Sequence, residues 1–162
     1  MEQKNKFPYE GFTLGMAAVD TVPVVLFAAG GAIAAGRLQS VWFVLGVVLC
    51  TAAGGCKAGW KYVLALRRQD VPLLQRMFRV LMPSGFGLML FSVPFAPAAW
   101  GGLASALVSM PSLACLLPGC AGIALMVWFG TGEKHENARA NWAEQWTNIA
   151  AQGFFLLALL LA

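Results

Sequence analysis

Charged residues are scarce in this sequence. Of its 162 residues, 11 are Lys or Arg and 7 are Asp or Glu, together 11% of the chain, whereas 59% are hydrophobic. A soluble domain usually has about a quarter charged residues, and a chain of this size buries only about 60 to 70% of its surface. The apolar excess is therefore too large for a water-soluble fold, and we expect it to face lipid.

The distribution of charge indicates how often the chain crosses the bilayer. No charged residue lies between Arg79 and Glu133, and three shorter runs also lack charge. A membrane helix needs about 20 apolar residues, so the long gap holds two crossings and each shorter run holds one. We predict an all-α, polytopic helical bundle that forms a single domain, 1–162, with five transmembrane helices at about 12–36, 41–65, 80–100, 104–130 and 140–162.

The first apolar stretch, from Phe12 to Gly36, resembles a signal peptide because Lys4 and Lys6 precede it. It is long for a signal sequence. We therefore expect it to be the first membrane helix.

Sequence motifs for metals and catalysis are also missing. There is no Gly-x-Ser-x-Gly, His-Glu-x-x-His or Gly-rich phosphate loop. The single histidine, His135, lacks a second histidine for a zinc set, and we expect it to be a solvated loop residue. We predict no cofactor and no metal, and an enzyme is the less favoured class. The cysteines lack Cys-x-x-Cys spacing and are expected to be small buried apolar side chains: Cys50, Cys56, Cys115 and Cys120.

Basic residues give the orientation. The net charge is +4, but the basic residues lie beside hydrophobic segments, which favours a role in membrane topology over nucleic-acid binding. If residues 66–79 are cytoplasmic, only Arg37 lies outside. We expect a multi-pass cell-membrane protein with its N-terminus in the cytoplasm and its C-terminus outside. The basic residues then on the inner side are Lys4, Lys6, Lys57, Lys61, Arg67, Arg68, Arg76, Arg79, Lys134 and Arg139.

Two regions leave alternatives open. Segment 69–82 has an apolar and a basic face, and Asp70 is suited to cap it, so we expect one basic amphipathic helix at the lipid headgroups; the alternative is a partner-binding helix. The third and fourth spans are rich in Pro and Gly. This predicts either ordinary kinked helices or a broken, re-entrant element around 103–112.

A polar stripe marks the last predicted helix. Its members fall within about 100° of arc on a helix, and the opposite side carries Trp142 and Trp146. Asn148 and Gln152 are too short to reach the headgroups, so they should face the bundle interior or a wet cavity. The stripe consists of Asn137, Asn141, Glu144, Gln145, Asn148 and Gln152.

The second predicted helix has a matching stripe of small residues that ends in two lysines: Gly46, Cys50, Gly54, Lys57 and Lys61. Small residues allow helices to approach closely. By the topology above, both lysines and Asp20 lie at the cytoplasmic side, at the depth of the other stripe, where opposite charges offset each other's desolvation. We predict one ligand-binding site made of Asp20, Lys57, Lys61, Glu144, Asn148 and Gln152.

Simpler interpretations exist for each member. Asp20 precedes Pro23 in a pattern typical of a helix start, so it is also suited to be an N-cap. Lys57 and Lys61 could extend to the headgroups. Asn148 and Gln152 could only hold helices together through hydrogen bonds.

Three function classes follow. The favoured one is binding or transport of an unknown small polar or anionic solute. The second is a non-catalytic accessory or anchoring membrane subunit, and the third is a membrane enzyme that acts on a lipid or isoprenoid substrate. Because five helices are few for a complete carrier, the expected partners are the lipid bilayer, further copies in a homo-oligomer or a larger membrane complex, and no nucleic acid.

Overall fold

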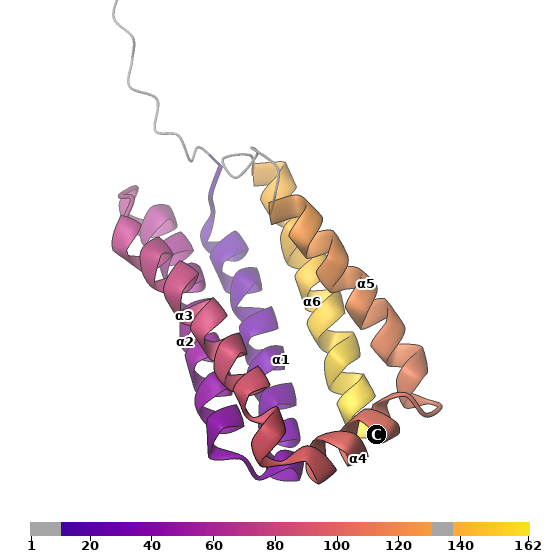
Figure 1. Cartoon of the computed structure of the whole chain (residues 1–162). Helices are drawn as coiled ribbons and strands as arrows, with labels where there is room; N and C mark the ends of the chain where they lie inside the picture. The colour runs from indigo at the N-terminus through magenta and orange to yellow at the C-terminus, as the bar shows by residue number, and fades with distance from the viewer. Residues whose placement is uncertain (1–10, 131–137) are drawn as a thin grey trace, which may run out of the picture.

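The computed structural model describes residues 11–130 and 138–162, and within these ranges the secondary structure is helical, with no strand. Figure 1 shows the helices arranged as an upright bundle closed at one end by a short crossing helix. The elements are α1 (Leu14–Leu38), α2 (Val41–Arg67), α3 (Pro72–Phe91), the 3-10 turn η1 (Val93–Phe95), α4 (Pro97–Leu107), α5 (Ser112–Gly130) and α6 (Ala138–Leu161).

Helix α1 begins earlier than Asp20. Thr13 is its N-cap, and the Thr13 hydroxyl accepts a hydrogen bond from the Met16 amide at 3.2 Å. Asp20 therefore lies inside the helix, and its interpretation as an N-cap is wrong. Pro23 lies within the helix without ending it. At the far end, Gln39 adopts a left-handed conformation that turns the chain directly into α2.

Helix α3 is one continuous helix, and this corrects the prediction for segment 69–82. The segment is helical from Pro72, but it forms the first half of α3 instead of a separate helix at the headgroups. It packs along α2, where Gly46 and Gly85 let the two backbones approach. Asp70 does not cap it, because Asp70 instead accepts a hydrogen bond from the Trp60 indole at 2.8 Å.

The third and fourth predicted spans were shifted along the sequence. The chain turns at η1, where the buried Ser92 hydroxyl accepts a hydrogen bond from the Trp100 indole at 3.1 Å. The gap left between these two predicted spans, 101–103, lies inside α4, and the helix is instead interrupted between Leu107 and Ser112. A continuous kinked helix over 104–130 is therefore wrong. Helix α4 has 11 residues, about 16 Å of helix, which is too short to cross a bilayer; it lies across one end of the bundle (Figure 1).

Within the described residues, four stretches are long and apolar enough to cross a membrane: Leu14–Leu38, Val41–Arg67, Pro72–Phe95 and Ser112–Phe129. The chain is thus a multi-pass helical membrane protein. Helix α6 lies where the fifth span was predicted and has 24 residues, but its first half is polar and it is not among these four, so a fifth crossing stays a prediction. It lies beside α1 and α5. The start of α1 and the C-terminus are at opposite ends of the bundle (Figure 1).

The packing divides the bundle into two parts. Helices α1, α2 and α3 form one part, α5 and α6 form the other, and the long helices join the parts through contact between α1 and α6. Near the α4 end, a buried apolar cluster fills the interior with residues Ala34, Leu38, Phe43, Val47 and Leu103. Away from that end, the two parts leave the space in which the candidate site lies.

Candidate intramembrane site

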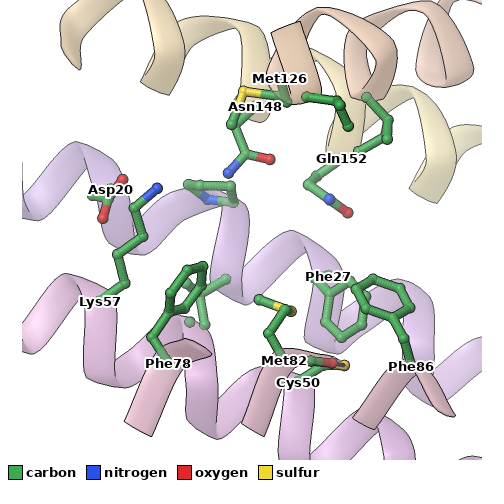
Figure 2. Close-up of a pocket in the computed structure, with 15 residues that line it drawn as sticks. Asp20, Phe27, Cys50, Lys57, Phe78, Met82, Phe86, Met126, Asn148 and Gln152 are labelled. Atoms are coloured by element: carbon green, nitrogen blue, oxygen red, sulfur yellow. Dashed lines mark hydrogen bonds between the residues drawn. The ribbon is translucent and has the colours of Figure 1, made fainter. Parts of the chain in front are cut away.

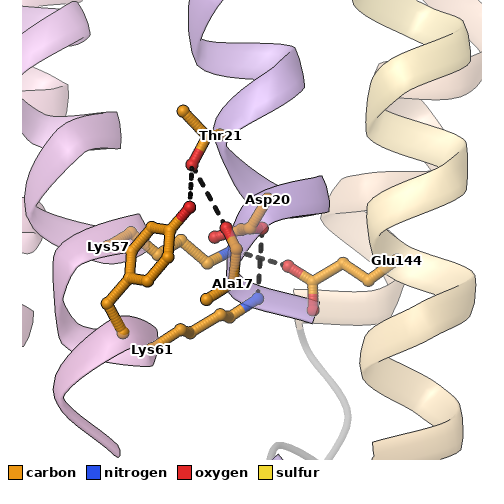
Figure 3. Close-up of polar contacts among 7 residues, drawn as sticks. Ala17, Asp20, Thr21, Lys57, Lys61 and Glu144 are labelled. Atoms are coloured by element: carbon orange, nitrogen blue, oxygen red, sulfur yellow. Dashed lines mark hydrogen bonds and ion pairs between the residues drawn. The ribbon is translucent and has the colours of Figure 1, made fainter. Parts of the chain in front are cut away.

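A buried ion pair joins α1 to α2. Lys61 Nζ lies 3.1 Å from Asp20 Oδ1, and the side chains are only 2% and 7% exposed, respectively. Next to it, the Thr21 hydroxyl donates to the Ala17 carbonyl at 3.1 Å and lies 3.5 Å from the Tyr62 hydroxyl (Figure 3). Burying either charge alone would cost several kcal/mol. The pair therefore favours the alignment of α1 against α2 that brings Asp20 and Lys61 together.

A second ion pair joins α2 to α6. Lys57 Nζ lies 2.7 Å from Glu144 Oε1 (Figure 3) and 5.6 Å from the centre of the Phe78 ring, a distance that permits a cation–π interaction. Among the described residues, the backbones of α2 and α6 make no close approach. The long side chains of Lys57 and Glu144 therefore span a gap between the two parts of the bundle.

That gap contains a cleft of about 360 Å³, a volume within the usual range for small-molecule sites. Helices from both parts contribute to its wall. In Figure 2, Asn148, Gln152 and Met126 project from one side, and Phe78, Met82 and Cys50 lie on the other. The lining residues are Asp20, Pro23, Val24, Phe27, Cys50, Gly54, Lys57, Phe78, Met82, Phe86, Ile123, Met126, Val127, Asn148 and Gln152.

The cleft is polar at one end and apolar at the other. Asp20, Lys57 and Asn148 lie together at one end, whereas Phe27 and Phe86 lie at the far end (Figure 2). The two phenylalanine rings meet edge to face, with centroids 6.4 Å apart. A ligand that filled this space would therefore meet a charged group at one end and aromatic rings at the other.

The structure brings the six predicted site residues into one region. Asp20, Lys57, Asn148 and Gln152 line the cleft, while Lys61 and Glu144 form ion pairs with two of these four. Lys61 does not extend to the headgroups, because its side chain is buried against Asp20. Whether the six residues bind a ligand stays a prediction.

Two further residues of the α6 stripe face inward. Asn141 and Gln145 are both buried, and within the described part of the chain neither amide atom of Gln145 has a hydrogen-bond partner. Asn137 and His135 lie outside the described residues. Of the cysteines, Cys50 is buried in the cleft wall, but Cys120 is exposed on α5, so the expectation that all four are buried is wrong.

The cleft walls supplied by α3 and α5 were not predicted from the sequence. Placing segment 69–82 at the headgroups removed Phe78 and Met82 from consideration as cleft residues. Their spacing carried a signal, since Phe78, Met82 and Phe86 recur every four residues and share one face of a helix. On α5, Ile123, Met126 and Val127 lack any polar neighbour in sequence that would mark them.

Histidine, cysteine and carboxylate side chains do not gather into a group suited to hold a metal ion within the two described ranges. Comparison of the chain with models of known protein families, with curated proteins and with solved structures found no match. Any function must therefore be argued from the geometry of the cleft.

Proposed function

We propose that this chain is a cell-membrane protein that binds, and by binding transports, a small polar or anionic solute in its intramembrane cleft. The observation that carries the proposal is the position of Lys57. Its ammonium group lies in the wall of a cleft that also holds the amides of Asn148 and Gln152. An ammonium with two neutral amides offers hydrogen-bond donors to an anion in surroundings of low dielectric constant, where charge-assisted hydrogen bonds are strongest.

Glu144 gives the site a built-in competitor. Lys57 already has a carboxylate at 2.7 Å, so an incoming anion would take the place of that carboxylate and would not meet a free charge. The side chains of Lys57 and Glu144 are 29% and 17% exposed, and partial exposure lowers the cost of separating them. When the displaced Glu144 carboxylate is solvated, the bound solute supplies the negative charge beside Lys57. The charge of Lys57 therefore stays balanced.

The proposed orientation places the polar end of the cleft toward the cytoplasm, with the N-terminus inside and the C-terminus outside. The positive-inside rule supports it. Arg67 ends α2 and Arg68 follows it, whereas Arg37 lies in the last turn of α1, at the α4 end. Cysteines introduced at Gln69 and at Gln39 in a cysteine-free background test it in intact cells. We expect a membrane-impermeant reagent to label only the Gln39→Cys variant, and labelling of only Gln69→Cys would reverse the orientation.

A binding assay tests the function. The purified protein in zwitterionic nanodiscs would be titrated with acetate, succinate and inorganic phosphate, with heat of binding and thermal stabilisation as readouts. We expect at least one probe to bind, and Lys57→Met to weaken its binding about tenfold or more, because an ionic hydrogen bond is lost.

Lys57→Arg is the matched control, since it keeps the positive charge and should retain most of the affinity. Arg37→Met is a second control, because it also removes one positive charge but lies in the last turn of α1, outside the cleft. Binding that is equally strong in Lys57→Met would exclude this site, and a lack of any anion binding, short-chain or long-chain, would overturn the proposed function.

A further inference from the structure

The cleft is open on its side, between α3 and α5. These helices supply facing walls, with Phe78, Met82 and Phe86 on α3 and residues of α5 opposite. Within the described ranges, however, the α3 and α5 backbones do not approach each other closely. At this opening Phe86 is 47% exposed and Val127 is 64% exposed. Both lie in stretches apolar enough to cross the membrane, so the opening faces the hydrocarbon of the bilayer.

The chemistry of the cleft changes along its length. Lys57 and Asn148 occupy the polar end, and the wall beyond them is mainly formed by apolar side chains, among them Phe27, Met82 and Phe86, with one amide, that of Gln152 (Figure 2). Asp20 and Phe27 mark the two ends on α1, which corresponds to about 10 Å of helix rise. A fully polar solute would fill the first part only and would leave the apolar part without a partner. Such a division of polar and apolar walls fits a molecule with the same division.

We propose that the ligand is an anionic single-chain amphiphile, which has a carboxylate or phosphate head and an alkyl or isoprenoid chain. This inference rests on the proposed function, since it uses the same site and names its ligand class. The head binds Lys57 and Asn148, and the chain lies along Phe27, Met82 and Phe86. The molecule enters from the bilayer through the opening between α3 and α5.

Two physical arguments favour a single chain. The cleft of about 360 Å³ lies at the low end of small-molecule sites, and a two-chain phospholipid would need to leave one chain outside. An amphiphile also arrives already dissolved in the bilayer, so its chain moves from one apolar environment to another, and the Lys57 ion pair with the head supplies the selectivity.

Photolabelling in nanodiscs tests this inference. Decanoate with a diazirine at its chain end would be added to the protein at a fixed mole fraction of the lipid, and the labelled peptides would be identified by mass spectrometry. We expect label on the apolar end of the cleft, at Phe27 or Phe86. Lys57→Met should reduce this label about tenfold or more, and Lys57→Arg should restore it. A diazirine alkane without a carboxylate should label the outer surface instead.

A pair of α3 variants separates the cleft from the lipid surface. Phe86→Ala removes a cleft residue and should reduce labelling severalfold, whereas Phe91→Ala alters a residue that is 50% exposed and packs on Trp42, outside the cleft, and should leave labelling unchanged. If acetate or phosphate binds through Lys57 but decanoate leaves the cleft unlabelled, the amphiphile is wrong and the proposed function stands. If neither short nor long anions depend on Lys57, both are wrong.

Discussion

One face of α2 is used in two different ways at its two ends. Near the α4 end, Gly46 lies against Gly85 of α3 so closely that a Cβ on Gly46 would be 2.6 Å from the Gly85 carbonyl oxygen. At the other end, the same face carries Lys57 and Lys61, whose side chains extend to carboxylates on α6 and α1. Small residues draw two backbones together, while long charged side chains connect backbones that stay apart.

This difference explains where a cleft exists in a chain with so little interior. At the glycine end, backbone-to-backbone packing of α2 on α3 leaves no room for a ligand. At the lysine end, the backbones of α2 and α6 stay apart, and the ion pair between the Lys57 and Glu144 side chains connects the two helices. Variants along this face of α2 and its partners should therefore lower the free energy of unfolding by different amounts.

The buried ion pair should give the largest loss of stability. Asp20→Asn leaves the Lys61 ammonium buried without a counterion, and we expect the free energy of unfolding to fall by about 3 to 5 kcal/mol. SDS-induced unfolding in mixed micelles measures it. The double variant Asp20→Asn, Lys61→Met should recover most of the loss, because no charge remains buried. A single variant as stable as the unaltered protein would show that the pair contributes nothing.

The glycine contact should come next. A Cβ on Gly85 would lie 2.7 Å from the Gly46 carbonyl oxygen and 2.9 Å from the Cys50 amide nitrogen, and backbone atoms cannot rotate away as a side chain does. We expect Gly85→Val to lower the free energy of unfolding by about 1 to 3 kcal/mol or more. Gly87→Val on the same helix is the control, since nothing lies within 4 Å of its Cβ position. Equal losses in the two variants would refute close packing at Gly85.

Gly54 lies between the two ends and should be more tolerant. A Cβ there would be 2.8 Å from Cγ2 of Val24, which is a side-chain atom. We expect Gly54→Ala to cost about 1 kcal/mol or less, because movement of Val24 relieves the contact and alanine favours the helix over glycine. Combining it with Val24→Ala should remove the clash. Thermal unfolding measures the stability of all three variants. If the double variant loses as much stability as the two single variants together, Gly54 and Val24 are not in contact.

Glu144→Gln should have the smallest effect on stability, and it should strengthen binding. The Lys57–Glu144 pair is partly exposed, so its loss should cost about 1 kcal/mol or less. The variant removes the competitor for Lys57, and we expect binding of an anionic probe in nanodiscs to become severalfold tighter. Weaker binding in this variant would mean that Glu144 belongs to the ligand contacts and is not displaced by the anion.

Charge and polarity in the sequence were enough to predict the helical membrane bundle and to bring Asp20, Lys57 and Glu144 together. A charge cannot remain in hydrocarbon alone, so polar residues at similar depth on different helices must meet. The helix limits between 70 and 112 could not be predicted in the same way. There, Pro94 lies in η1 and Pro97 begins α4, but a membrane helix also tolerates proline in its interior, as α1 does at Pro23.

The apolar side of the cleft was hidden for a related reason. The sequence does not distinguish whether Met126 and Val127 face lipid or a cavity, because both environments are apolar. Only the packing of α5 on α6, with Gly122 against Ala151, decides which side of α5 faces inward. Side chains that avoid lipid can be placed from sequence, and those that are indifferent to it cannot.

The two ion pairs also differ in when they can form during biosynthesis. Asp20 and Lys61 both belong to the first helical hairpin, so their charges can pair once α2 has been made. Lys57 must wait for Glu144, which follows it by 87 residues and belongs to α6. The nascent chain therefore carries one intramembrane lysine without its carboxylate until α6 arrives. Docking of α6 is then the step that neutralises this charge.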